Sequence, residues 1–164
     1  MNPVEMRGLN MAMVAAGFAA GTTTTISTTA TVPFCINGKA LSKTAITNGA
    51  TPTTDAGNAL AFRPVPKNNG SVFVACLDAT GTVKVCQGEV TPLDPANGLF
   101  QTAPEFPMIP DTLTPFGYLI VKSDSTYVAT TTGWLFGTHN LSAVTGMTYT
   151  FVDIMTLPVR PQIS

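Results

Sequence analysis

The chain has 164 residues, which is the size of one ordinary domain. It carries 8 Lys and Arg against 9 Asp and Glu, so its net charge is −1. This balance excludes the basic face that binding to nucleic acid or to an anionic membrane requires. Only 10% of the residues are charged, compared with about 25% in typical soluble domains. Because so few charges protect poorly against association, we expect much of the surface to contact other protein.

The composition is rich in threonine, with 27 residues. Together with Val and Ile it favours β structure, and the 14 Gly and 13 Pro add many turns. We therefore expect an all-β fold, an antiparallel β-sandwich or jelly-roll-like barrel with a short N-terminal helix and Pro-rich arms. The expected division is an N-terminal helical arm (1–20), a β-domain (21–157) and a C-terminal tail (158–164).

The first residues predict a helix. Asn2 is a suitable N-cap, Pro3 suits the first helical position, and Glu5 stands three residues after the cap. Apolar residues then recur at roughly helical spacing over about residues 3–16. A helix of this length is marginal in water, so it would pack either on the chain's own β-domain or on a neighbouring chain. The flanking charges do not suit a signal peptide, and we expect a mature N-terminus.

Asn37-Gly38 predicts the first hairpin. The dipeptide separates Phe34-Cys35-Ile36 from Lys39-Ala40-Leu41, and Asn-Gly favours the positive φ angles of a type I′ turn. In that register Phe34 lies opposite Leu41, with Ile36 on the same side.

A second hairpin is predicted around Gly81, in a three-residue loop that pairs Asp78 with Thr82. One face then carries the expected core side chains Phe73, Ala75, Leu77, Val83 and Val85. The other face carries Val72, Val74, Cys76, Lys84 and Cys86. Cys76 is diagonal to Cys86, about 7–8 Å away, which is too far for an unstrained disulfide. With Cys35 as the third cysteine, we expect three free, mostly buried thiols in a reducing compartment.

The connection over residues 91–116 contains six prolines, which excludes a central strand there. Large apolar residues alternate with the prolines, so this connection should lie against an apolar surface of the same chain or of another. Strands are expected at 118–122 and 149–155, and a further one at 134–136.

Few residues suggest chemistry. His139 is the single histidine and lies in a turn-like segment without evident partners for catalysis. The carboxylates are dispersed, and no nucleotide-binding glycine motif or metal-ligand spacing occurs. We therefore expect no catalytic residue, no cofactor-binding residue and no metal site, and hence not an enzyme. The aromatic side chains of Tyr118, Trp134, Phe136 and Tyr149 could form a sugar platform, but such residues are more often core in a β-sandwich.

Several segments resemble small virion proteins of tailed bacteriophages. They are TTTTISTTATVPFCINGKA, SKTAITNGATPTTD, VFVACLDATGTVKVCQGEV, FPMIPDTLTPFGYLIVK and FVDIMTLPVRPQ, which together span roughly residues 20–162. The resemblance implies a β-rich, often trimeric decoration or cement protein bound outside the head shell. It carries over no functional residue, because that group of proteins has no motif of known chemistry.

The expected function is thus a non-enzymatic capsid decoration protein that stabilises the head shell. The expected partners are the major capsid protein and further copies of the chain, possibly as a trimer, without nucleic acid or membrane. Assembly would occur in the host cytoplasm, with the mature protein on the capsid exterior. The alternative is a head- or tail-fibre domain that binds host glycan. The residues predicted to contact neighbouring chains are Val4, Leu9, Met11, Met13, Val14, Phe18, Phe100, Phe106, Met108 and Ile109.

Overall fold

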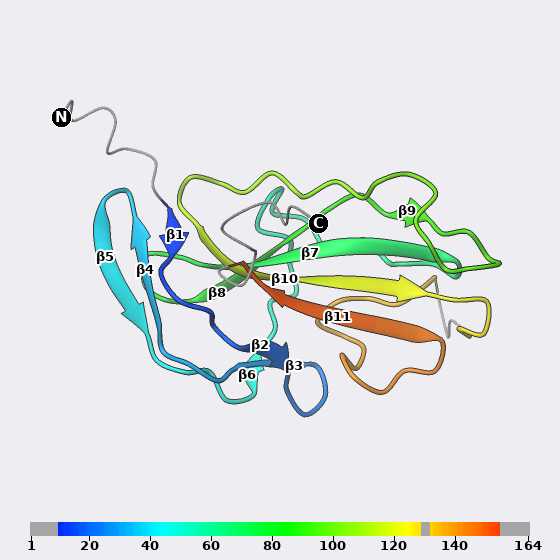
Figure 1. The fold of residues 1–164 in the computed structure, drawn as a ribbon, viewed down its shortest axis with the longest axis horizontal. Coiled ribbons are helices and arrows are strands. Elements are labelled where there is room, and N and C mark those ends of the chain that lie inside the picture. The colour runs from blue at the N-terminus through cyan, green and yellow to red at the C-terminus, as the bar shows by residue number, and fades with distance from the viewer. Residues whose placement is uncertain (1–9, 129–131, 155–164) are drawn as a thin grey trace, which may run out of the picture.

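Three antiparallel sheets form a sandwich-like all-β fold, as the sequence predicts (Figure 1). The computed structural model describes residues 10–128 and 132–154. The main sheet has the strand order β11-β10-β7-β8, with β9 beside the start of β7. Its strands are β7 (Asn69–Leu77), β8 (Val83–Gln87), β9 (Thr91–Pro92), β10 (Thr114–Ser123) and β11 (Met147–Asp153).

Two small sheets come from the N-terminal part of the chain. The N-terminal sheet has the order β1-β4-β5 and consists of β1 (Met11–Ala12), β4 (Val32–Ile36) and β5 (Lys39–Lys43). The second small sheet has the order β2-β3-β6 and consists of β2 (Phe18–Ala20), β3 (Thr25–Thr28) and β6 (Gly49–Ala50). The N-terminal sheet lies at one end of the molecule (Figure 1).

The helix expected over residues 3–16 is wrong where the structure describes it. Residues 1–9 lie outside the described residues, and residues 11–12 form a strand that pairs with β4. The N–H of Met13 then donates to the carbonyl of Pro33 at 2.9 Å. Ala12, Ala16 and Phe18 are buried. The spacing of four between the alanines fits either a helix or an extended chain, but the spacing of two between Ala16 and Phe18 fits only an extended chain. Backbone pairing with β4, which lies further along the sequence, makes residues 11–12 a strand rather than part of a helix.

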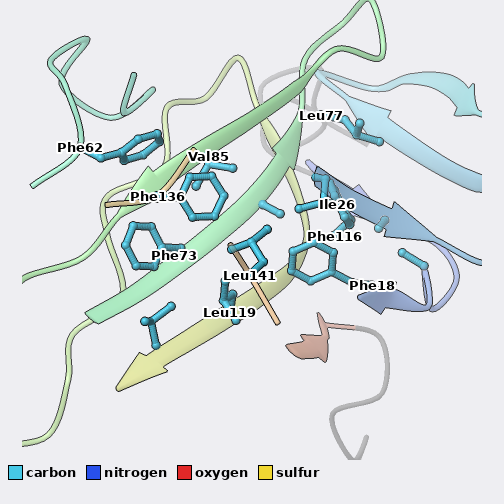
Figure 2. Packing of buried hydrophobic residues seen from close by; sticks show 14 of the residues in the cluster. Phe18, Ile26, Phe62, Phe73, Leu77, Val85, Phe116, Leu119, Phe136 and Leu141 are labelled. Carbon is cyan, nitrogen blue, oxygen red and sulfur yellow. The ribbon is translucent and has the colours of Figure 1, made fainter. Parts of the chain in front are cut away.

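Aromatic side chains pack on the inner face of the main sheet, some against loop residues and others against a small sheet (Figure 2). Phe73 stacks on Phe136 at 5.0 Å between ring centroids, and Phe62 meets both rings edge-on. Phe18 contacts Phe116 edge-on at 5.4 Å. Such pairs contribute about 0.5–1.5 kcal/mol each beyond the area they bury. The aromatic core therefore joins the inner face of the main sheet to strand β2.

Both predicted hairpins are confirmed in register. Phe34 pairs with Leu41, and both turn residues of Asn37-Gly38 have positive φ. Leu77 pairs with Val83, and Gly81 has a φ of 75°. The local turn residues therefore set the pairing of these strands correctly.

The second face of β7 is also buried, which the hairpin pattern alone did not predict. Val72, Val74, Cys76 and Cys86 form a second apolar cluster with Leu113. The cover is the segment between β9 and β10, residues 93–113, which we call the arm (Figure 1). An unbroken apolar run such as residues 72–77 is typical of a strand buried on both faces.

One expectation about the proline-rich connection is wrong, because its last residues, 114–116, belong to a strand. Pro115 lies in β10, which is a central strand, although prolines were expected to exclude one here. The pairing with β7 shifts register between Pro115 and Gly117. On the other side, β11 pairs only from Gly117 onward. Pro115 is therefore tolerated because it lies beyond the end of β11 and next to a bulge.

Candidate interaction surface

The arm is attached to the outer face of the main sheet by side-chain packing. Ile109 and Leu113 pack on the second apolar cluster. The ring of Phe106 stands perpendicular to that of Tyr118, with centroids 5.1 Å apart. At the start of the arm, the ammonium group of Lys122 lies 4.9 Å from the centre of the Phe100 ring. These contacts are distributed along the arm, so it is a packed element rather than a solvated linker.

Hydrogen bonds from Asn10 and the close approach permitted by Gly88 also keep the arm against the main sheet. The side-chain amide of Asn10 donates to the carbonyl of Leu113 at 3.1 Å and also to that of Asp111. Its oxygen accepts from the N–H of Asn37 at 2.9 Å. A Cβ on Gly88 would come within 2.6 Å of the Glu105 carbonyl oxygen. The glycine thus allows the arm to approach the sheet closely, and Asn10 ties its end to the N-terminal sheet.

Three large apolar side chains of this packed arm are exposed to solvent, one of them Leu99 at 60%. Phe106 is 61% exposed and Met108 is 90% exposed. Cavities of about 280 Å³ and 600 Å³ adjoin the arm; the first is bordered by Arg63, Gln87 and Met108, and the second by Lys84, Pro110 and Leu113. A large apolar side chain held in solvent on a fixed backbone is suited to insertion into a partner surface.

A polar network beneath the arm has a structural role. One oxygen of the Asp55 carboxylate accepts from the N–H groups of Gly57 at 2.8 Å and Gln87 at 3.3 Å. The Gln87 amide pairs with the backbone of Arg63 at 2.7 and 2.9 Å. Arg63 forms an ion pair with Glu89 at 2.8 Å. These contacts attach the loop over residues 55–63 to the edge of β8.

The residues predicted to contact neighbouring chains fall into three groups. Val4 and Leu9 lie outside the described residues. Phe18 is buried in the chain's own core, while Phe100 and Ile109 are half-buried between the arm and the sheet. Exposed apolar side chains remain at Met11, Met13, Val14, Phe106 and Met108.

Sequence reasoning missed Asn10 and Tyr118, which position the arm. The sequence pattern assigns Asn10 no role, and nothing nearby in the sequence suggests a hydrogen-bond partner 103 positions away. Tyr118 could have been found, because it alternates with Leu119 on a strand whose two faces both need cover.

The titratable side chains mostly stabilise turns. His139 accepts the N–H of Leu135 on Nδ1 at 2.9 Å. Partial burial acts to raise the pKa of Asp78, but hydrogen bonds from Thr80 and Thr82 outweigh it and leave that pKa below its ordinary value. The side chain and N–H of Thr126 likewise lower the pKa of Asp124. Within residues 10–128 and 132–154, no group of three or more His, Cys, Asp or Glu could hold a metal ion.

The aromatic residues considered as a sugar platform lie largely inside the molecule. Trp134 and Phe136 are buried core residues, as their type suggested. The strand expected at 134–136 is wrong, because Trp134 forms only an isolated bridge with Val65. Its indole N–H donates to the carbonyl of Asn140 at 3.2 Å, and the Tyr149 hydroxyl donates to the same carbonyl. Trp134 therefore anchors a loop rather than facing solvent.

All three cysteines are free. Cys76 and Cys86 are buried under the arm, on the outer face of the hairpin, while Cys35 is half-buried. The hydrogen bond to the neighbouring Cys86 thiol, together with burial, raises the pKa of the Cys76 thiol. A buried thiol that stays protonated is a poor nucleophile, so Cys76 acts as a small packing residue.

Comparison with family models, with curated proteins and with solved structures finds no match to the chain. None of the described segments forms a helix that could cross a membrane. The most distinctive feature of the described surface is the set of exposed apolar side chains on the arm.

Proposed function

We propose that this chain is a non-enzymatic virion protein that decorates and stabilises a phage head shell. The observation that carries the proposal is the arm, which packs tightly on the main sheet yet holds Phe106 and Met108 in solvent. Neighbouring large apolar side chains that are exposed together often mark a surface that contacts another protein. The low charge of the chain and the resemblance of its sequence to phage virion proteins support the same function.

The use of its polar groups also supports a structural role. Asp78, Asp94 and Asp124 each accept N–H groups within their own turns. His139 and Gln87 bond to backbone groups. These side chains stabilise loops, which suits a rigid protein that functions by presenting surface. Trp134, the side chain that best suits stacking on a sugar, is in the core, so no observation favours the glycan-binding alternative.

The direct test is co-sedimentation of the purified protein with heads that lack it. A decoration protein should bind at a saturating stoichiometry of hundreds of copies per head. It should raise the melting temperature of the heads by mass action, because it binds the assembled shell and not free subunits. Binding in only a few copies, or binding to host glycan without binding to heads, would contradict the proposal.

A pair of variants links binding to the arm. Met108→Asp places a charge at the most exposed apolar position of the arm and should weaken retention on heads at least tenfold. Val128→Asp is the matched control, because Val128 is 82% exposed but follows the far end of β10. If both variants were retained on heads equally well, Met108 of the arm would not contribute to binding.

A further inference from the structure

The two edges of the main sheet differ in how they are protected. The strand order β11-β10-β7-β8 makes β8 and β11 the edge strands. At β8, the N–H of Ala56 donates to the carbonyl of Val85 at 2.8 Å. The N–H of Gln87 donates to the carboxylate of Asp55 at 3.3 Å. The loop over residues 55–63 therefore covers the β8 edge with hydrogen bonds from within the chain.

No such cover is present at β11 in the described part of the chain. Across residues 10–128 and 132–154, β10 is the only strand that pairs with β11, and the backbone of residues 148–152 bonds to no other segment. An edge strand turns alternate N–H and C=O groups away from its neighbour. The strand β11 therefore presents a row of backbone donors and acceptors along one side of the main sheet (Figure 1).

The sequence of β11 favours pairing with a further strand. Natural edge strands commonly discourage such pairing with charged residues, prolines or bulges. Residues 147–152 contain no charged residue and no proline, and β11 pairs with β10 over its whole length without a register shift. Their side chains are mostly threonine, aromatic and β-branched, which are the types that suit a strand.

The core is also incomplete beside this edge. On the inner face of β10, Leu119 and Val121 are fully buried. Their partners on β11, Phe151 and Tyr149, pack on the same core cluster but are only half-buried. A strand added next to β11 would cover these two rings. Only an extended strand can at the same time match the row of backbone groups, so the chemistry of the edge specifies its partner as a β-strand.

The strand β11 is complementary to itself. In an antiparallel pair of two β11 strands centred on Thr150, Tyr149 of each copy lies opposite Phe151 of the other, on the inner face. On the outer face Thr148 lies opposite Val152. Aromatic pairs and pairs of β-branched side chains are favourable across strands.

This register also satisfies the constraints of charge and backbone geometry. Asp153, the one charged residue of β11, lies opposite Met147, so no like charges meet. A centre on a residue pairs positions of equal parity, which keeps each side chain on its own face and sets outward-facing backbone groups against each other.

We propose that two copies of this chain pair through β11 about a two-fold axis at Thr150, so that the main sheet runs continuously through both. The contact joins the same surface of each copy, and it therefore closes at a dimer. The loop over residues 55–63 keeps the opposite edge from extending the sheet further. This contact goes beyond binding to a head shell and can be tested on the isolated protein.

Opposite charges at the centre of the pair test the two-fold axis. In sedimentation velocity over about 1–100 µM the wild type should form dimers and nothing larger, and Thr150→Lys or Thr150→Glu alone should raise the dissociation constant at least about tenfold, because like charges meet at the axis. An equimolar mixture should dimerise again, because Lys then faces Glu. Thr150 is exposed on the outer face of β11, so either charge is compatible with folding of one copy.

Leu60→Lys is the control for added charge, because Leu60 is 65% exposed and lies in the loop at the opposite edge. It should dimerise as the wild type does. A wild type that stays monomeric would show that something other than a second copy covers β11, and it would overturn the proposal. A mixture of the two Thr150 variants that does not dimerise would overturn the two-fold axis.

Cysteine cross-linking tests the register directly. With Cys35→Ser as the background, Thr150→Cys should form a disulfide-linked dimer in air, because facing residues of antiparallel strands have Cα atoms about 4.5–5.5 Å apart. Thr148→Cys is the matched control, since Thr148 is exposed on the same face. Its counterpart in the other copy is displaced by about 13 Å along the strand, so it should remain monomeric on a non-reducing gel. Equal cross-linking of the two variants would contradict the pairing.

The outcome separates this inference from the proposed function. Monomeric protein that still saturates heads would refute the β11 contact and leave the decoration role intact. Dimers that cross-link at position 150 but do not bind heads would refute the decoration role and leave the contact intact.

Discussion

The ring of Phe106 stands at 90° to the ring of Tyr118, and this contact ties the arm to the centre of the main sheet. Tyr118 alternates with the core residue Leu119, so it projects from the outer face of β10. Phe106 makes this contact while 61% of the residue stays exposed. The same side chain therefore fixes the arm and presents apolar surface, which explains how an exposed phenylalanine can be held rigidly.

Gly88→Ala should displace the arm. The new methyl group would lie 2.6 Å from the Glu105 carbonyl oxygen and 3.2 Å from that of Val72, and backbone atoms cannot easily move away. Overpacking of this kind costs about 1–3 kcal/mol. We expect a lower free energy of unfolding in urea and faster protease cleavage within residues 93–113. Gly98→Asn is the control, since open space surrounds Gly98 and Asn tolerates its positive φ. Unchanged cleavage in Gly88→Ala would show that the arm is not seated against Gly88.

Leu77→Ala should lower the free energy of unfolding by about 2–5 kcal/mol, because it removes a fully buried side chain and leaves a cavity. Urea unfolding followed by tryptophan fluorescence measures the loss, since Trp134 belongs to the same core cluster. Leu99→Ala should change stability by less than about 0.5 kcal/mol, because Leu99 is exposed. Equal effects of the two substitutions would contradict the observed register of the β7–β8 hairpin.

Asp78 should stabilise its hairpin only while its carboxylate is ionised. The carboxylate accepts from the N–H and hydroxyl of Thr80 at 2.8 and 2.6 Å and from the N–H of Thr82 at 3.0 Å. Because the folded state lowers this pKa, the contribution is complete above the ordinary value of about 3.9 and is lost as the pH falls through the lower folded value. Asp78→Ala should cost about 1 kcal/mol at pH 6. Urea unfolding at decreasing pH should show this difference shrinking in acid, and a constant difference would argue against the carboxylate.

The three thiols should differ in reactivity. Cys35 is half-buried, whereas Cys76 and Cys86 are buried beneath the arm. With a disulfide reagent at pH 8, the native protein should show one thiol that reacts faster than the other two, and all three should react after unfolding. Cys35→Ser should remove the fast thiol. Three equally fast thiols would indicate that the arm leaves the sheet readily.

The sequence by itself determined the fold class and the two hairpins. Threonine content, turn residues and alternation led correctly to an all-β fold. Asn37, Gly38 and Gly81 adopt positive φ angles, which few other residue types tolerate. They therefore fix the position of each turn, and the turn sets which residues of the two strands pair. These features depend on neighbours along the chain, which is why a single sequence is sufficient to predict them.

Tertiary structure decided the rest, because the interactions involved join residues far apart in the sequence. Residues 11–12 are a strand, not part of a helix, because β4 supplies the hydrogen-bond partners. Phe18 is a core residue because Phe116 and Phe151 surround it. The arm covers its own main sheet, although its composition fitted contact with another chain equally well. Periodicity and composition show that a side chain needs cover, but only the packing of distant segments determines what covers it and which side chains remain exposed for a partner.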